Sequence, residues 1–160
     1  MHDNEHLRKL CNTEMSSWNE SHGIIMNLEE QLKRDEAVRS KVYNDSLGIP
    51  TIGVGRNLRD VGLSDEEIDF LLDNDIKRVR AELSSLDWYR NLDEIRRGAI
   101  ENMCFNMGLP TLLQFKNTII YLEAKDWQGA HDNMLKSLWA RQVGIRAERL
   151  AKQILTGEWQ

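Results

Sequence analysis

Residues 35–55 read DEAVRSKVYNDSLGIPTIGVG, and they contain two short runs of β-forming residues with turn formers between them. The runs are 41–43 and 51–54, and the residues between them at 44–48 are Asn, Asp, Ser, Leu and Gly. Val, Ile, Tyr and Thr favour strands, whereas Asn, Asp, Ser and Gly favour tight turns. The segment therefore predicts a small antiparallel hairpin.

A short helix is predicted immediately before this hairpin. Asn27 followed by Glu30 is a capping-box pattern, and Leu28 and Leu32 supply an apolar side. The pattern predicts a helix that ends near Glu36, so this carboxyl group stands between the helix and the first strand.

The sequence after residue 63 has the periodicity of helices. Ser64 and Glu67 form a second capping box, and apolar residues then keep helical spacing to Leu83, which predicts the longest helix. Asp93 opens a further helix, which is ended by Gly108 and the Leu-Pro pair that follows. More helices are expected at 115–124, 127–135 and 145–155, with Gly129, Gly144 and Gly157 as candidate breaks.

The expected fold class is α+β, predominantly helical. Because the sequence has no internal repeat and no Pro/Gly/Ser-rich linker, two lobes that share one long helix fit better than two independent domains. We expect a small lobe at 26–63, a connecting helix at 64–84, a helical lobe at 85–160 and a cleft between the lobes. Residues 1–25 form an extension of uncertain role. The predicted core of the helical lobe consists of Ile100, Met103, Phe115, Trp127, Met134 and Trp139.

Composition excludes several classes of protein. With 160 residues, 41% hydrophobic and 29% charged, the chain can bury a core and is not a disordered segment. It has no apolar run of about 18 to 20 residues and no signal-peptide pattern, so we expect synthesis in the cytoplasm and no stable membrane insertion. Cys11 and Cys104 lack disulfide or zinc-ligand patterns, and we expect free thiols. His2 and His6 with Cys11 form a weak metal pattern, for which a solvated tail is the better interpretation.

The charge is unevenly distributed along the chain. Residues 136–152 carry five bases against one acid, while residues 60–75 carry seven acids and no base. The basic segment is either a solvated helix face or a surface that meets an anionic polymer. The net charge of −5 and the lack of a recognition motif argue against nucleic acid as a partner.

The remaining chemistry is that of carboxyl groups, because the sequence lacks the common nucleophile, phosphate-loop and zinc-protease motifs. The spacing of Glu36, Asp45 and Thr51 allows all three to face one cleft. Glycoside hydrolysis needs two such carboxyl groups, one to donate a proton and one to stabilise charge or activate water. From spacing alone, however, solvated or capping acids remain the more common explanation.

A family resemblance strengthens the catalytic interpretation. Residues 26–160 resemble the phage-type lysozymes, the muramidases of T-even phage endolysins in glycoside hydrolase family 24. The segments that carry the resemblance are 35–55, 96–108, 136–139, 146–149 and 156–159, in the family's order. The resemblance implies a lysozyme-like two-lobed fold.

The resemblance also assigns residue roles. It implies that Glu36 is the general acid, Asp45 the second carboxylate, and Thr51 the hydroxyl that helps to hold the attacking water. We expect partial burial of Glu36 to oppose its ionisation, and a wide carboxyl separation of about 6.5–9.5 Å, which predicts inversion at the anomeric carbon. The implied substrate-binding residues are Asn57, Phe105, Thr118, Asn133, Trp139 and Arg146. Core packing is the alternative for Phe105 and Trp139, and simple solvation is the alternative for Arg146.

Four positions depart from the family pattern. Arg56 stands where the best-known members have a His, Leu47 and Leu138 replace polar or charged residues, and Asn106 replaces a Gln. These changes concern substrate preference more than the three catalytic candidates.

The resemblance implies hydrolysis of the β-1,4 bond between N-acetylmuramic acid and N-acetylglucosamine in bacterial peptidoglycan, with no cofactor and no metal. We expect a monomer that is made in the host cytoplasm and acts on the cell wall during lysis, with a separate pore-forming protein for export. One alternative is a lysozyme-like domain reused for wall binding or assembly, with residues 1–25 as the arm that meets the partner. A second is a lytic transglycosylase, against which the presence of both Asp45 and Thr51 argues.

Overall fold

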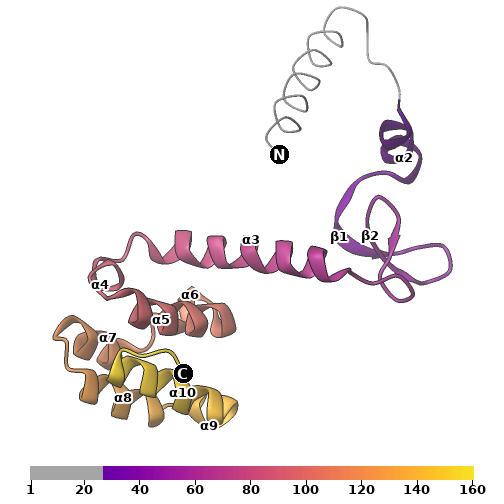
Figure 1. Ribbon diagram of the computed structural model, residues 1–160. Coiled ribbons are helices and arrows are strands. Elements are labelled where there is room, and N and C mark those ends of the chain that lie inside the picture. The colour runs from indigo at the N-terminus through magenta and orange to yellow at the C-terminus, as the bar shows by residue number, and fades with distance from the viewer. Residues whose placement is uncertain (1–26) are drawn as a thin grey trace, which may run out of the picture. The chain divides into compact units, whose positions relative to one another are not determined.

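The computed structural model describes residues 27–160, and these form two compact units with a boundary between Ser64 and Asp65 (Figure 1). The predicted extension, with its His pair and Cys11, lies outside the described residues.

The N-terminal unit begins with α2, Leu28–Glu36, whose cap follows the sequence prediction. The side chain of Asn27 accepts a hydrogen bond from the backbone N–H of Glu30 at 3.0 Å, and the side chain of Glu30 accepts one from the backbone N–H of Asn27 at 3.4 Å. This reciprocal pairing satisfies two N–H groups at the start of the helix. The capping box is therefore confirmed, and Glu36 is the last residue of the helix.

A three-stranded antiparallel sheet completes this unit. Strand β1, Arg39–Asn44, pairs with β2, Pro50–Gly53, which confirms the predicted hairpin. A third strand, β3, Arg56–Asn57, pairs with β2 and was not predicted. It is only two residues long, so it has no alternation of polar and apolar residues to reveal it.

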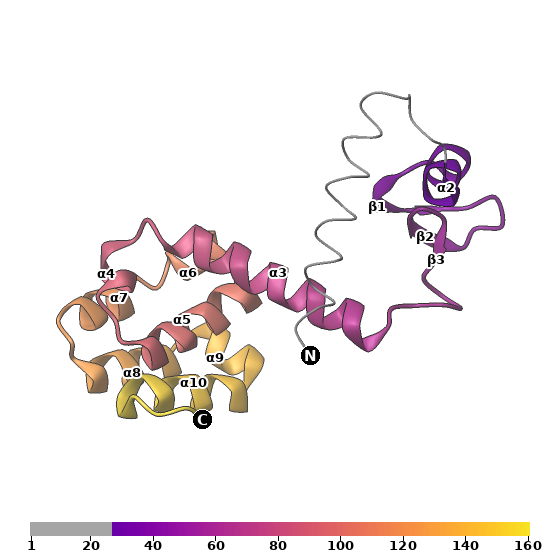
Figure 2. The ribbon, with the colours of Figure 1, turned by 45° about the horizontal axis from the view of Figure 1, so that its top comes forward.

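The C-terminal unit is helical. Its longest helix, α3, packs against α5, and α8 packs against α10, as Figures 1 and 2 both show. Five of its helices match segments expected from the sequence: α3 Asp65–Leu83, α5 Glu94–Met107, α7 Lys116–Glu123, α8 Trp127–Leu135 and α10 Ile145–Thr156. The predicted N-cap of α5 is also confirmed, because the Asp93 side chain accepts a hydrogen bond from the backbone N–H of Arg96.

Three short helices of this unit were not predicted. They are α4 Asp87–Arg90, α6 Leu109–Leu112 and α9 Leu138–Val143. Gly108 does end α5, but Leu109 and Pro110 open α6 instead of a loop. Proline is tolerated there because the N–H groups of a first helical turn have no intrahelical acceptor.

The prediction that Gly129 breaks a helix was wrong, because this residue lies inside α8. A Cβ atom at Gly129 would come within 2.5 Å of the Tyr121 ring on α7. The glycine therefore permits a close approach of α7 and α8. Its role is in packing and not in ending a helix.

The core of the C-terminal unit agrees largely with the sequence prediction. Ile100, Met103, Met134 and Trp139 are buried, while Phe115 and Trp127 are partly buried against them. Cys104, also buried, is a free thiol. Helix α10 adds the buried side chains of Leu150 and Ile154, so the core lies among α5, α8 and α10.

A polar cluster ties α3 and α4 to α5. The Tyr89 hydroxyl donates to one carboxylate oxygen of Glu101 at 2.7 Å, and Arg80 donates to the other at 3.0 Å. Burial, followed by the hydrogen bond and the charge of Glu101, raises the pKa of Tyr89 to about 12. The folded chain thus favours the neutral phenol.

We expect Tyr89→Phe to lower stability by about 1–2 kcal/mol at neutral pH, because the bond to a charged acceptor is lost. The pKa of Tyr89 is raised from 10 to about 12 in the folded chain. The contribution of the neutral phenol to the free energy of unfolding is therefore complete below pH 10 and disappears as the pH rises through 12. The stability difference between wild type and Tyr89→Phe should therefore shrink over this range in urea unfolding experiments. A constant difference would contradict the assignment. Tyr121→Phe is the control, because the Tyr121 hydroxyl bonds no carboxylate within the described part of the chain.

Candidate functional site

All three catalytic candidates lie in the N-terminal unit. Glu36 ends α2, Asp45 lies in the turn between β1 and β2, and Thr51 is the second residue of β2. The hairpin fixes the last two relative to each other.

The turn holds the Asp45 carboxylate by its backbone. One carboxylate oxygen, Oδ1, accepts the N–H groups of Leu47 and Ile49, each at 2.8 Å. The backbone N–H of Asp45 in turn donates to the carbonyl oxygen of Ile49 at 3.0 Å. The second oxygen, Oδ2, has no hydrogen-bond partner among residues 27–160. The carboxylate is therefore fixed in place with one oxygen available to a ligand or a water.

Thr51 is anchored at the same point of the chain. The residue is 4% exposed, and its hydroxyl donates to the carbonyl oxygen of Ile49 at 2.9 Å. With its proton used in this bond, the hydroxyl oxygen can accept a hydrogen bond from a water. The peptide groups of one residue, Ile49, thus position both candidates. Sequence reasoning missed this residue because its role is in its backbone.

The Glu36 carboxyl group lies against Gly55. A Cβ atom at Gly55 would come within 2.9 Å of Glu36 Oε2, and the φ angle of Gly55 is +69°. The absence of a side chain at Gly55 therefore leaves the space that the carboxyl group occupies. Glu36 is exposed, so its own unit does not supply the burial expected for the general acid. The sequence marks Gly55 only as a glycine after a strand.

We expect Gly55→Ala to reduce activity about tenfold, because its methyl group displaces the Glu36 carboxyl group and misplacement of a reacting group is costly. The positive φ angle adds a stability loss of about 1 kcal/mol. Gly62→Ala is the matched control: its φ angle is +64°, but its Cβ atom meets only the Leu58 carbonyl oxygen at 3.9 Å. An activity assay and thermal unfolding separate the two effects. Equal loss of activity in both variants would refute the specific role of Gly55.

Asn57 lies in β3, where it pairs with Thr51 in the sheet. Its side chain accepts a hydrogen bond from the backbone N–H of Asp60 at 2.8 Å and donates one to the Asp60 carboxylate at 2.9 Å. The structure thus places Asn57 near the catalytic candidates, with its side chain closing the loop after β3.

Thr118 and Asn133 are brought together in the C-terminal unit. Thr118 is 2% exposed, and its hydroxyl donates to the side-chain oxygen of Asn133 at 2.8 Å. Thr118 therefore positions Asn133, whose side chain lines a pocket of about 620 Å³.

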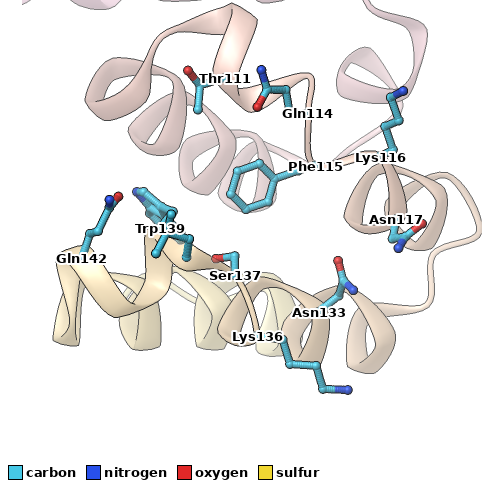
Figure 3. A pocket seen from close by; sticks show the side chains of 11 residues that line it. Thr111, Gln114, Phe115, Lys116, Asn117, Asn133, Lys136, Ser137, Trp139 and Gln142 are labelled. Carbon is cyan, nitrogen blue, oxygen red and sulfur yellow. The ribbon is translucent and has the colours of Figure 1, made fainter.

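Trp139 lines the same pocket and also belongs to the core, so core packing is confirmed for it and substrate binding stays a prediction. Its ring N–H donates to the side chain of Asn106 at 2.8 Å, and its ring packs edge-to-face on Phe115. Figure 3 shows Trp139, Phe115 and Asn133 along the pocket.

Phe105 and Arg146 line a second pocket of about 380 Å³. Arg146 donates through Nη2 to the side-chain oxygen of Asn102 at 2.7 Å, and the Phe105 ring is 47% exposed. Asn133 does not line this second pocket. No group of three or more potential metal ligands occurs among the described residues.

Comparison with known proteins identifies the family to which the chain belongs. The family model described as phage lysozyme matches residues 33–153, which include all nine candidate residues. The chain belongs to the phage lysozyme family. The resemblance read from the sequence and the α+β lysozyme-like fold are thereby confirmed.

Several curated relatives agree with this family. Probable T4-type lysozyme 1 of Dictyostelium discoideum is 29% identical over 84% of this chain and 96% of its own length. The endolysin of Salmonella phage P22 is 33% identical over 69% of the chain and 79% of its own length. The pre-baseplate central spike protein Gp5 of Enterobacteria phage T4 is 30% identical over 82% of the chain. The matched segment is 28% of the spike protein.

Membership of the phage lysozyme family supports a glycosidase of the lysozyme class. It also supports a muramidase-like activity. No helix in the described part of the chain is both long and apolar enough to cross a membrane.

Proposed function

We propose that the chain hydrolyses the β-1,4 bond between N-acetylmuramic acid and N-acetylglucosamine in bacterial peptidoglycan, with inversion at the anomeric carbon. The observation that carries this proposal is the joint anchoring of Asp45 and Thr51 on the backbone of Ile49. It leaves a carboxylate oxygen and a hydroxyl oxygen, both acceptors, to orient one water.

The proposed reaction divides the chemistry among three side chains. Glu36 donates a proton to the leaving glycosidic oxygen, while Asp45 accepts a proton from the attacking water. Thr51 accepts a hydrogen bond from that water and so directs its lone pair towards the anomeric carbon. An attack from the face opposite the leaving group gives the inverted product.

The proposal extends to the setting in which the enzyme acts. We propose a monomer that needs neither metal nor organic cofactor, is made in the host cytoplasm and reaches the wall through a separate pore-forming protein during lysis. Relatives named T4-type lysozyme and endolysin support the lysozyme activity on which this proposed setting depends.

A second candidate function is a lysozyme-like module within a larger assembly. The match to a central spike protein over 82% of the chain favours it, because that relative is a structural component by name. Wall clearing separates the two candidates, since an assembly module without activity would leave peptidoglycan intact.

The decisive test is mass and NMR analysis of the fragments that the chain releases from purified peptidoglycan. Release of fragments with a reducing N-acetylmuramic acid end and α configuration in the first product is expected. A first product of β configuration would exclude inversion, and a 1,6-anhydro product would indicate a lytic transglycosylase. Asp45→Asn should release far less of the same product, because the amide cannot accept the proton of the water.

A further inference from the structure

Strand β3 carries the residue that faces Thr51 across the sheet. Asn57 pairs with Thr51, and the backbone N–H of Leu58 donates to the carbonyl oxygen of Pro50 at 2.9 Å. Figure 2 shows β3 beside β2. Residues that face each other in an antiparallel pair place their side chains on the same side of the sheet, with Cβ atoms about 4.5–5.5 Å apart. The Asn57 side chain therefore flanks Thr51 directly.

The loop after β3 supports this short strand. With two residues, β3 is shorter than most strands in proteins, so its pairing with β2 supplies few hydrogen bonds. The carbonyl oxygen of Asn57 accepts hydrogen bonds from the backbone N–H groups of Val61 and Gly62, each at 3.2 Å. The loop at 57–62 thereby closes on the residue that faces Thr51.

Asp60 holds both polar atoms of the Asn57 side chain. Asn57 Oδ1 accepts a hydrogen bond from the backbone N–H of Asp60 at 2.8 Å, and Asn57 Nδ2 donates one to Asp60 Oδ2 at 2.9 Å. An amide that commits its oxygen and one N–H to its own loop keeps only one N–H for a ligand. These contacts are typical of a residue that holds its neighbours in place.

The place of the Thr51 hydroxyl depends on the strands beside it. Thr51 lies in β2, which is the middle strand, with β1 on one side and β3 on the other. A displacement of β3 changes one flank of Thr51 and, with it, the place of the hydroxyl that orients the attacking water in the proposed reaction. Misplacement of a reacting group by about 1 Å lowers the rate by up to about 10²-fold.

We propose that Asn57 and Asp60 form a positioning pair for the proposed reaction, in which Asp60 fixes the Asn57 amide and Asn57 holds Thr51 from the side of β3. The inference rests on the proposed function, because the step that the pair serves is the attack of water on the glycosidic bond. Asn57 is then a positioning residue and does not bind the sugar. Loss of the pair lowers kcat and leaves KM nearly unchanged, because the pair acts on the reacting water and not on substrate binding.

The test exchanges the two side chains in the full chain. Asn57→Asp alone places two carboxylates where an amide N–H met a carboxylate, and it should lower kcat about tenfold with KM within about twofold. The double variant Asn57→Asp/Asp60→Asn again joins an amide donor to a carboxylate acceptor, so kcat should return to within about twofold of the wild-type value. Fragment release from purified peptidoglycan gives both constants. An unchanged kcat in Asn57→Asp, or a raised KM that persists in the double variant, would overturn the inference.

Arg59→Gln is the matched control. The Arg59 side chain is 59% exposed and donates to Oδ1 of the Asp60 carboxylate at 3.2 Å, whereas Asn57 donates to Oδ2. Its replacement should leave kcat and KM unchanged. A tenfold loss of kcat in this variant would count against the pair, because activity would then follow the charge of the loop.

An NMR measurement on the free chain keeps the inference separate from catalysis. The methyl signal of Thr51 is recorded in wild type, in Asn57→Asp and in the double variant. It should shift in the single variant and return in the double variant. If this pattern appears but wild type releases no fragments, the pair holds Thr51 and the proposed function fails. If fragments are released but the Thr51 signal is the same in all three proteins, the inference fails and the proposed function remains.

Discussion

Replacing Glu36 with Gln should lower kcat/KM for wall hydrolysis by about 10²- to 10⁴-fold, the usual contribution of a general acid. The amide keeps the size of the side chain but has no acidic proton to give to the leaving oxygen. Glu36 is exposed and has no hydrogen-bond or ion-pair partner within the described residues, so its replacement should leave the stability unchanged. Release of soluble fragments and thermal unfolding measure the two quantities.

The neighbouring acid provides the control for this variant. Asp35 lies on the same helix, is exposed and pairs with Arg34 at 2.8 Å. Asp35→Asn should retain nearly full activity, because its carboxyl group has no part in the proposed reaction. If Glu36→Gln keeps more than about a tenth of the activity, the general acid lies elsewhere.

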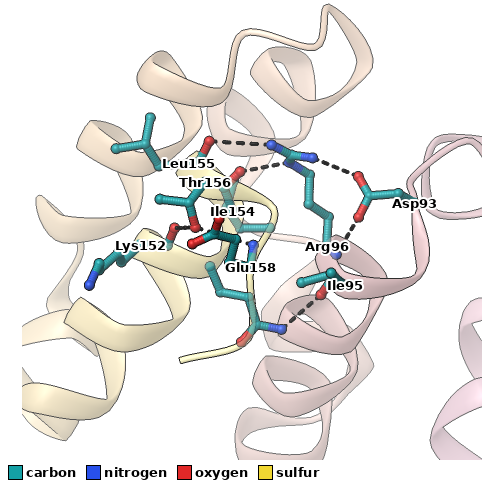
Figure 4. Close-up of polar contacts among 9 residues, drawn as sticks. Asp93, Ile95, Arg96, Lys152, Ile154, Leu155, Thr156 and Glu158 are labelled. Atoms are coloured by element: carbon teal, nitrogen blue, oxygen red, sulfur yellow. Dashed lines mark hydrogen bonds and ion pairs between the residues drawn. The ribbon is translucent and has the colours of Figure 1, made fainter.

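Replacing Arg96 with Met should destabilise the C-terminal unit by about 3 kcal/mol, or about 10 °C in Tm. Figure 4 shows Arg96 bridging α5 and the end of α10. Its guanidinium donates to the carbonyl oxygens of Ile154 at 2.7 Å and Leu155 at 3.3 Å, and to the Asp93 carboxylate at 2.7 Å. It also lies 4.1 Å from the centre of the Trp127 ring. The side chain is only 13% exposed, so water cannot readily replace these partners.

Arg78→Met serves as the comparison. Arg78 pairs with Asp75 on the surface of α3, with 65% of its side chain exposed, and its loss should cost less than about 0.5 kcal/mol. Urea unfolding monitored by circular dichroism gives both values. Similar small losses in the two variants would show that the bridge between α5 and α10 contributes little.

Much of the fold could be predicted from local sequence signals. Asn27 and Asp93 cap helices because their side chains bond N–H groups three residues on, which a sequence pattern records directly. The hairpin follows from turn formers between two β-forming runs. The third strand, the four-residue helices and the position of Gly129 depend on contacts with distant segments, and these leave little local signal.

The sequence nominates the side chains of the candidate site, whose catalytic roles stay predictions, but it does not reveal the backbone groups that support them. Glu36, Asp45 and Thr51 have the chemistry of glycoside hydrolysis, and family resemblance selects them. Ile49 acts through its backbone N–H and C=O groups, and Gly55 acts because it has no side chain. Residue type alone reveals neither role. The burial of Thr118 behind Asn133 likewise follows from the packing of α7 on α8.

The anchoring of Asp45 and Thr51 on the backbone of one residue, Ile49, also bears on how the enzyme can evolve. Because the N–H and C=O of position 49 make these bonds, its side chain is under little direct selection from the chemistry. The side chain at position 49 can therefore change to suit folding, while the separation between the Asp45 carboxylate and the Thr51 hydroxyl is preserved. Proline is the exception, since it lacks the N–H that fixes the carboxylate.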